Sequence, residues 1–121
     1  MAGTIIISNN PRIGLPLNSF AFEYLADRIW EQFDPSLSRV RDEIFLPRVQ
    51  DQMFITLTKQ DIDGFRAFVD AVTKTKKADP NANEQGVLRS YYELWDLLLD
   101  KLKEDPRYPK MKGPNPGEGN G

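Results

Sequence analysis

Two long stretches of helical hydrophobic periodicity, at residues 58–75 and 84–104, constrain the fold of this chain more than any other feature. The first stretch begins at Thr58, which can act as a capping residue, and its apolar face consists of Ile62, Phe65, Phe68, Val69 and Val72. The second has a broader apolar face, formed by Leu88, Tyr91, Tyr92, Trp95, Leu98, Leu99 and Leu102. Apolar stripes of this kind stabilise helices mainly by packing against other elements. We therefore expect both helices to share one core, with Phe65 and Trp95 at its centre.

A third helix is expected at residues 18–33, where Asn18 or Ser19 can cap the first turn. The Asp-Pro pair that follows disfavours further helix, because the residue before a proline avoids helical backbone angles. On a wheel of about 100° per residue, the core face of this helix consists of Phe22, Leu25, Ala26, Ile29 and Phe33. The opposite face carries two aromatic residues among acidic ones, which is unusual for a surface that meets only water.

Short β-branched runs at residues 4–8 and 53–57 predict strands. We expect Gly14 and Pro16 to lie in a loop after the first strand. Residues 36–50 fit either a helix or a strand, and we favour a short helix followed by an extended piece. These elements predict an α+β fold in which about three main helices pack on a small sheet or hairpin.

The chain is expected to form one compact α+β domain over residues 1–105. Its 121 residues are in the usual size range of a single domain. Half of the residues from 106 to 121 are proline or glycine. A segment of this composition buries too little apolar surface to offset the entropy lost on ordering. We therefore expect residues 106–121 to be a flexible tail.

The composition excludes several classes of function. The chain has no histidine and no cysteine, so it lacks the usual zinc ligands, thiol nucleophiles, histidine-containing triads and disulfides. Its net charge of −2 and the lack of a basic stripe argue against nucleic-acid binding. The N-terminal sequence does not resemble a signal peptide, and the apolar runs are far shorter than a membrane span. We expect a cytoplasmic protein that acts without membranes.

Two rows of acidic residues could hold a hard cation such as Mg²⁺ or Ca²⁺, because both ions prefer oxygen ligands. The rows lie at helical spacing and consist of Glu23, Asp27 and Glu31, and of Glu93, Asp96 and Asp100. Each row also has an arginine nearby, Arg28 or Arg89, so that solvated helix faces with ordinary ion pairs explain both. We favour that explanation and expect no metal, no cofactor and no catalytic residue.

Large apolar residues on polar helix faces can mark a surface that binds a partner, and the alternative is that a strand or the segment 36–50 covers them. Phe20 and Tyr24 lie beside Asp27 and Glu31 on the outer face of the first helix, and Leu97 lies in the polar arc of the last helix. We predict that these five residues contact another protein. The acidic members favour a partner with a basic surface.

The sequence therefore favours a small cytosolic protein-binding module over an enzyme. An immunity protein or an inhibitor that masks its partner belongs to this class. Two alternatives remain open, a hydrolase that uses carboxylates and Mg²⁺, and a structural or assembly subunit of a larger, phage-like particle. The sequence does not fix the oligomeric state.

Overall fold

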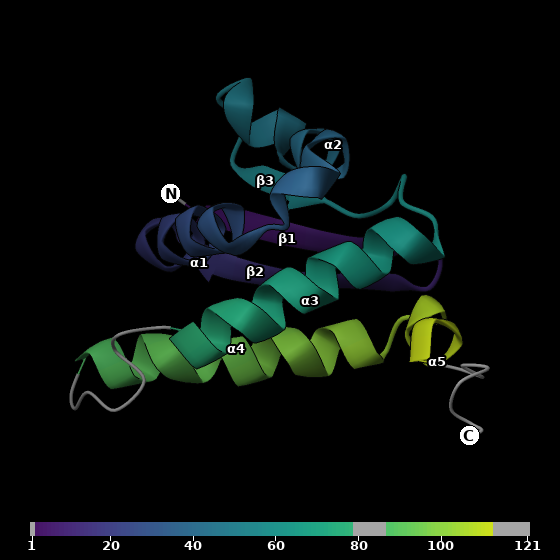
Figure 1. Ribbon diagram of the computed structural model, residues 1–121. Helices are drawn as coiled ribbons and strands as arrows, with labels where there is room; N and C mark the ends of the chain where they lie inside the picture. The colour runs from purple at the N-terminus through teal and green to yellow at the C-terminus, as the bar shows by residue number, and fades with distance from the viewer. Residues whose placement is uncertain (1, 79–86, 113–121) are drawn as a thin grey trace.

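The computed structural model describes residues 2–78 and 87–112 and shows an α+β fold (Figure 1). The elements follow one another along the chain as β1 (Ala2–Asn9), β2 (Arg12–Asn18), α1 (Ser19–Gln32), the 3-10 turn η1 (Pro35–Leu37), α2 (Ser38–Val49), β3 (Phe54–Thr56), α3 (Ile62–Ala78), α4 (Val87–Lys103) and α5 (Arg107–Lys112). The expected fold class is confirmed.

The sheet has three strands in the order β2-β1-β3. Strands β1 and β2 form an antiparallel hairpin in which Ile5 pairs with Leu15, and β3 runs parallel to β1 with Ile55 beside Ile5. The expectation of a loop at Gly14 and Pro16 was wrong, because both residues lie within β2. Proline lacks an N–H group and is tolerated on edge strands such as β2.

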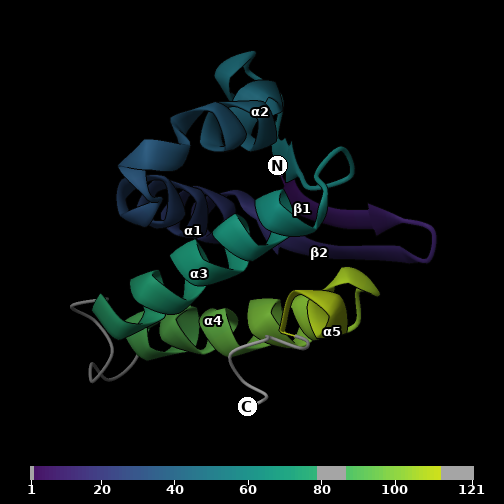
Figure 2. The ribbon, with the colours of Figure 1, turned by 45° about the vertical axis from the view of Figure 1, so that its right-hand side comes forward.

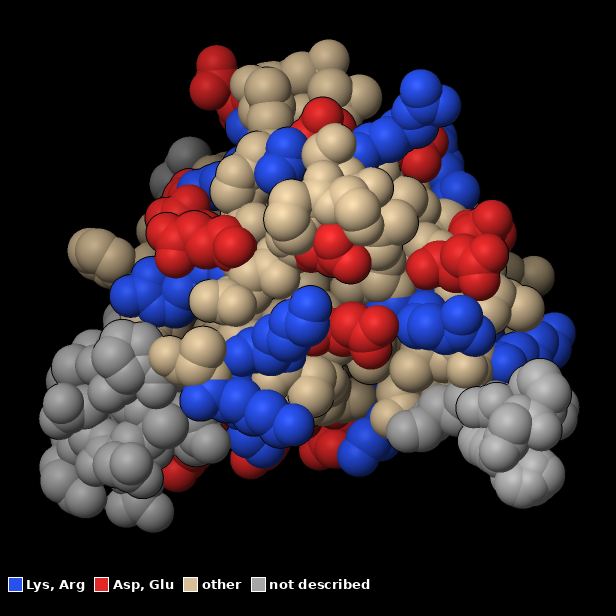
Figure 3. All heavy atoms as spheres, viewed as in Figure 1, with Lys and Arg blue, Asp and Glu red and all other residues tan. Residues whose placement is uncertain are grey.

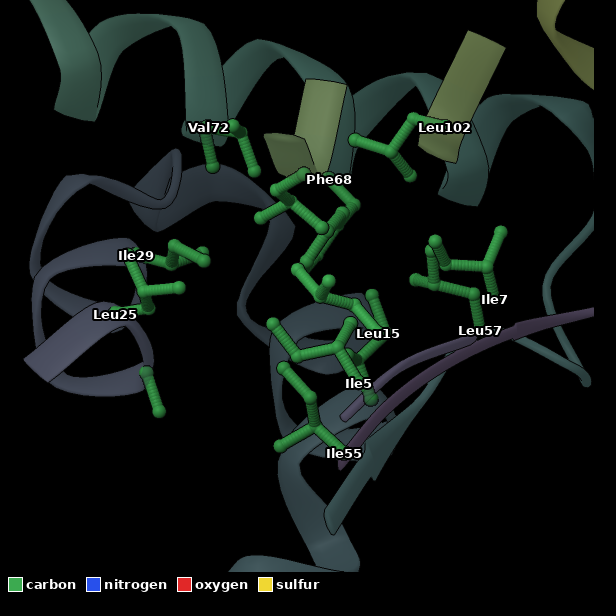
Figure 4. Close-up of a cluster of buried hydrophobic side chains, with 14 of the residues drawn as sticks. Ile5, Ile7, Leu15, Leu25, Ile29, Ile55, Leu57, Phe68, Val72 and Leu102 are labelled. Atoms are coloured by element: carbon green, nitrogen blue, oxygen red, sulfur yellow. The ribbon is translucent and has the colours of Figure 1, made fainter. Parts of the chain in front are cut away.

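Helices α1, α3 and α4 lie together on one side of the sheet, and α2 lies beside β3 (Figures 1 and 2). Alternate residues of the strands point from the sheet into a shared apolar core (Figure 4). Among the core side chains, Phe65 and Trp95 are fully buried, as the helical stripes predicted. The labelled side chains of Figure 4 come from the sheet, from Leu57 directly after β3, and from α1, α3 and α4, and they are Ile5, Ile7, Leu15, Leu25, Ile29, Ile55, Leu57, Phe68, Val72 and Leu102.

The packing between β1 and α1 is close because Gly3 has no side chain. Gly3 is buried, and a Cβ atom at this position would overlap the ring of Phe22. The ring is itself fully buried, so it has no free space into which it could move. Gly3 thus lets α1 approach the sheet.

The helical predictions at residues 18–33 and 58–75 are confirmed as α1 and α3, although α3 begins four residues later than expected. Asp61 caps α3 in place of Thr58, since its Oδ1 accepts a hydrogen bond from the Gly64 amide at 2.9 Å. The expected extended piece before residue 50 was wrong, because α2 continues through Pro47 to Val49. The start of the last expected helix, at residues 84–86, lies outside the described residues.

The chain beyond residue 105 also differs from expectation. Residues Arg107–Lys112 form α5, which packs against α3, where we had expected the flexible tail to begin at residue 106. Tyr108 and Met111 contact the core cluster, and these contacts supply the apolar burial that the composition had led us to discount. The remainder of the predicted tail, residues 113–121, lies outside the described residues.

A mostly buried arginine, Arg107, connects α5 to the sheet. Arg107 Nη1 donates hydrogen bonds to the carbonyl oxygens of Leu57 at 2.9 Å and Gln60 at 2.7 Å. Arg107 Nη2 donates to the carbonyl oxygen of Ile7 at 2.8 Å. The Asp105 carboxylate, which is 1% exposed, accepts from Arg107 Nε at 2.9 Å and from Nη2 at 2.7 Å. All five N–H groups of this guanidinium are therefore used in holding the fold.

Candidate partner-binding surface

Helix α1 presents one face to the core and the opposite face to solvent. The helix begins at Asn18, whose side-chain oxygen accepts a hydrogen bond from the Ala21 amide at 2.8 Å. Its inward face is formed by Ala21, Phe22, Leu25, Ala26 and Ile29, all of which are buried. The helical repeat then turns Phe20, Asp27 and Glu31 outward, and all three side chains are exposed or partly exposed.

Phe20 is the most exposed large apolar side chain in the described part of the chain, at 78% of its full area. Burying such a ring against a partner would contribute a few kcal/mol of hydrophobic stabilisation, about 1.5–3 kcal/mol for a complete burial. In the free protein, a ring in this exposed position contributes little hydrophobic stabilisation. The placement therefore matches what a partner contact requires.

Tyr24 lies at the border of this face and has a second role. Its ring packs against Trp95 of α4, with the centroids 6.4 Å apart, and the Arg28 guanidinium lies 4.2 Å above it. The side chain is half-buried against the core cluster. Tyr24 thus joins α1 to α4, and only its remaining surface is available to a partner.

Asp27 belongs to a cluster of ion pairs that connects α1 to α2. Arg48 of α2 donates from Nη2 to Asp27 Oδ1 at 2.6 Å and from Nε to Glu23 Oε1 at 3.1 Å, and Nη2 also contacts Glu23. Burial would lower the pKa of Arg48, but the two carboxylates outweigh burial and raise the pKa above its usual value. Glu31 lies one turn further along α1, with no ion-pair partner in the described residues.

Leu97 is not brought together with the other four predicted residues. It lies on α4, two positions after Trp95, and a helix turns by about 200° over two residues. Because Trp95 is fully buried, Leu97 points away from the core and is 43% exposed. Its role in partner binding remains a prediction.

The sequence analysis missed exposed apolar residues on α2. Leu46 and Val49 are both exposed, whereas Ile44 and Phe45 between them and the core are buried. The spacing of three residues between Leu46 and Val49 would have placed them on one helix face. That signal was obscured because Pro47 led us to expect extended structure here.

An excess of acidic residues and most of the exposed apolar side chains occur together on the layer formed by α1, η1 and α2. Residues 19–51 contain seven acidic and four basic side chains, whereas the rest of the chain has slightly more basic than acidic ones. This layer also contains four of the five large apolar side chains that are exposed in residues 2–78 and 93–111, namely Phe20, Leu37, Leu46 and Val49. By contrast, basic and acidic side chains alternate across α3 and α4 in the face shown in Figure 3.

The rows of acidic side chains do not form a metal site in the part of the chain that the structure describes. No three carboxylates there lie close enough together to hold an ion. Glu23 and Asp27 are instead paired with Arg48, and Asp96 is paired with Lys76 of α3. Three of the six acidic residues, Glu23, Asp27 and Asp96, therefore form ion pairs with neighbouring helices.

Two hollows lie away from the α1–α2 layer. A hollow of about 450 Å³ on the sheet is lined by Thr4, Ile6, Ser8, Asn9, Arg12, Ile13, Gly14, Met53 and Phe54. Its only charged lining residue is basic, which opposes a basic partner. The second, of about 350 Å³, adjoins Asp105 and Arg107, whose hydrogen-bonding groups are already engaged with each other and with the backbone.

No helix in residues 2–78 or 87–112 is long and apolar enough to cross a membrane.

Comparison with known proteins points to one group. No protein-family model matches the chain. The chain is 34% identical over 108 residues to the immunity protein CdiI of Burkholderia pseudomallei, and the match covers 88% of this chain and 94% of that protein. The solved complex of the CdiA-CT toxin from Burkholderia pseudomallei E479 with its cognate CdiI immunity protein contains a chain of the same fold. That match has a TM-score of 0.75 and 28% identity, and it covers 87% of this chain and 97% of the other.

Proposed function

This chain belongs to the CdiI family of immunity proteins, and on that premise we propose that it binds and masks a CdiA-CT toxin in the cytoplasm. The observation that carries this proposal is the 34% identity to CdiI, which extends over 94% of that protein. The related CdiI immunity protein occurs in complex with its cognate CdiA-CT toxin. Inhibition then requires only binding, which suits a chain without histidine or cysteine.

The toxin-binding surface in this proposal is the outer face of α1 together with the adjoining face of α2. Phe20 supplies an exposed apolar anchor, and the exposed edge of Tyr24 extends it. Asp27 and Glu31 favour a basic surface on the toxin and speed its association. We keep Leu97 as a separate contact to be tested, because it lies on a different face.

The proposal is tested by co-expressing this chain in a bacterial host with the CdiA-CT toxin of the strain that encodes it. We expect growth to be restored by this chain and to fail with an empty vector. The CdiA-CT toxin of Burkholderia pseudomallei E479 serves as a second arm, which measures how narrow the specificity is. Growth arrest by the cognate toxin despite abundant folded immunity protein would overturn the proposal.

The surface is tested by the change Phe20→Ala, with binding measured by titration calorimetry against the purified cognate toxin. We expect at least a tenfold loss of affinity, since exposed aromatic anchors contribute strongly at interfaces. The melting temperature should not change, because the ring is exposed in the free protein. Phe20→Leu should retain most of the affinity, and Leu97→Ala shows independently whether α4 contributes. Full affinity in Phe20→Ala would place the toxin elsewhere.

A further inference from the structure

We propose that the hollow between α1 and α2 receives a single lysine or arginine side chain of the toxin. This inference rests on the proposed toxin binding and names the chemical group recognised there. The hollow has a volume of about 250 Å³, enough for one long side chain, and it is lined by Asp27, Trp30, Phe45, Arg48 and Val49. Four of these five residues were not predicted to contact a partner.

One side of the hollow is apolar and held in place by the core. Trp30 and Phe45 meet edge to face, with ring centroids 5.2 Å apart and planes at 84°. Phe45 is almost fully buried, so it fixes the position of this wall, while Val49 stands exposed beside it. These three side chains offer a firm surface to the aliphatic stem of an incoming residue.

The other side of the hollow is formed by Asp27 and Arg48, and Glu23 pairs with Arg48 without lining the hollow. Arg48 forms ion pairs with both Glu23 and Asp27, so two carboxylates face one guanidinium. The carboxylate side chains are 45% and 53% exposed, whereas Arg48 is 26% exposed. The carboxylates are therefore more accessible to an approaching cation than Arg48 is.

The carboxylates also have unused hydrogen-bonding capacity. Asp27 binds Arg48 through Oδ1, and Glu23 binds it through Oε1. Within the described residues, Asp27 Oδ2 and Glu23 Oε2 have no partner. Each carboxylate can thus accept a second charge-assisted hydrogen bond without losing the first.

The aromatic wall directs a cation to these carboxylates. The Arg41 guanidinium already lies over the Trp30 ring, 4.0 Å from its centroid. One face of Trp30 is therefore covered by a cation of this chain, which disfavours a second cation stacked beside it. An apolar group alone would leave the carboxylates desolvated, and an acidic group would be repelled. A lysine or arginine side chain can contact both sides of the hollow. Its aliphatic stem packs on Val49, and its charged end group binds the Asp27 carboxylate.

The test measures binding of the purified cognate toxin by calorimetry at low and high salt. Asp27→Asn keeps the shape of the side chain and removes its charge, and we expect about a tenfold loss of affinity with a weaker salt dependence. Asp63→Asn is the matched control, because Asp63 is an exposed acid on α3. It should bind as the unchanged protein does. Val49→Ala removes the exposed part of the apolar wall, so it should lower affinity a few-fold and leave the salt dependence unchanged.

The basic residue of the toxin is identified by changing each of its lysines and arginines to alanine in turn. We expect one toxin variant for which Asp27→Asn causes no further loss, since both changes remove the same contact. Additive losses for every toxin residue, or unchanged binding by both Asp27→Asn and Val49→Ala, would overturn the inference while toxin binding stands. If the unchanged protein neither binds the toxin nor protects cells, the proposed function fails first, and this inference fails with it.

Discussion

Arg107 and Arg48 each hold carboxylate side chains, but their surroundings differ. Arg107 is mostly buried, and its guanidinium binds the buried Asp105 and three backbone carbonyl groups. Arg48 lies near the surface and binds two half-exposed carboxylates that retain free oxygen atoms. The comparison separates an arginine whose interactions are complete from one whose partners can still bind another molecule. We expect the first to determine stability and the second to affect binding.

The largest effect is expected for Arg107→Ala. The change removes both guanidinium hydrogen bonds from the buried Asp105 carboxylate, which keeps only the bond from the amide of residue 107 at 2.8 Å, and it removes the Arg107 donors from three carbonyl groups. Removing one member of a buried ion pair typically costs about 3–5 kcal/mol. Urea denaturation monitored by circular dichroism measures the loss. Arg66→Ala is the control, because this exposed arginine on α3 also donates to a backbone carbonyl, that of Met111, at 3.0 Å. Equal losses in both variants would contradict the special role of Arg107.

The same pair should give stability a defined dependence on pH. Burial alone would raise the pKa of Asp105, but hydrogen bonds and charge from Arg107 outweigh it and lower the pKa below its usual value of 3.8. A lowered folded-state pKa contributes stability that is present above the unfolded pKa and lost as the pH falls through the folded value. Unfolding free energies should therefore fall below about pH 4, the ordinary range of a free aspartate.

In Arg107→Ala the sign of this contribution should reverse. Without the guanidinium, burial is the largest influence and should outweigh the remaining hydrogen bond from the amide of residue 107, so that the pKa of Asp105 rises above its unfolded value. Stability from this group is then greatest at low pH and is lost as the pH rises through the folded pKa. The difference in unfolding free energy between the two proteins should thus narrow between pH 7 and pH 4. A constant difference across this range would show that Asp105 does not titrate differently in the two proteins.

The arrangement around Arg107 could not have been predicted from the sequence. Its carbonyl acceptors lie 47, 50 and 100 residues earlier in the chain, and they carry no side-chain signal. Backbone groups become acceptors only once the sheet and α3 are in place. The composition of residues 106–121 led us to expect a flexible segment, whereas the helix begins with the arginine that fixes it.

The outer face of α1 was predictable because it depends on local periodicity alone. Asn18 caps the helix, and the helical repeat turned Phe20 outward as expected. The contribution of α2 was not predictable in the same way, since Pro47 made the helix ambiguous and hid Val49. The hollow and the Arg48 ion pairs arise only when α1 and α2 pack together.

A smaller effect on stability is expected for Arg48→Met than for Arg107→Ala. The half-exposed pairs with Glu23 and Asp27 should contribute about 1 kcal/mol or less, as is typical near a surface. The layer becomes more negative without the guanidinium, so association with a basic toxin should become faster and more dependent on salt. Stopped-flow association rates at two salt concentrations measure this change. A slower association would show that Arg48 itself contacts an acidic group of the toxin.

The smallest effect is expected at Asp51, which ends the helix that carries Arg48. Asp51 has a φ of 65°, and the Gln52 amide donates to the Pro47 carbonyl at 2.9 Å, as in a Schellman motif. Glycine adopts this conformation without the steric cost that a side chain adds, but it loses more entropy on folding. Asp51→Gly should therefore stabilise the fold by about 0.5 kcal/mol, as measured by thermal unfolding.

Asp51→Asn removes the same charge and tolerates the same backbone, so it controls for electrostatics. If both changes raise the melting temperature equally, charge and not backbone geometry limits the end of α2. If only glycine does so, the backbone geometry at Asp51 limits the stability of the end of α2.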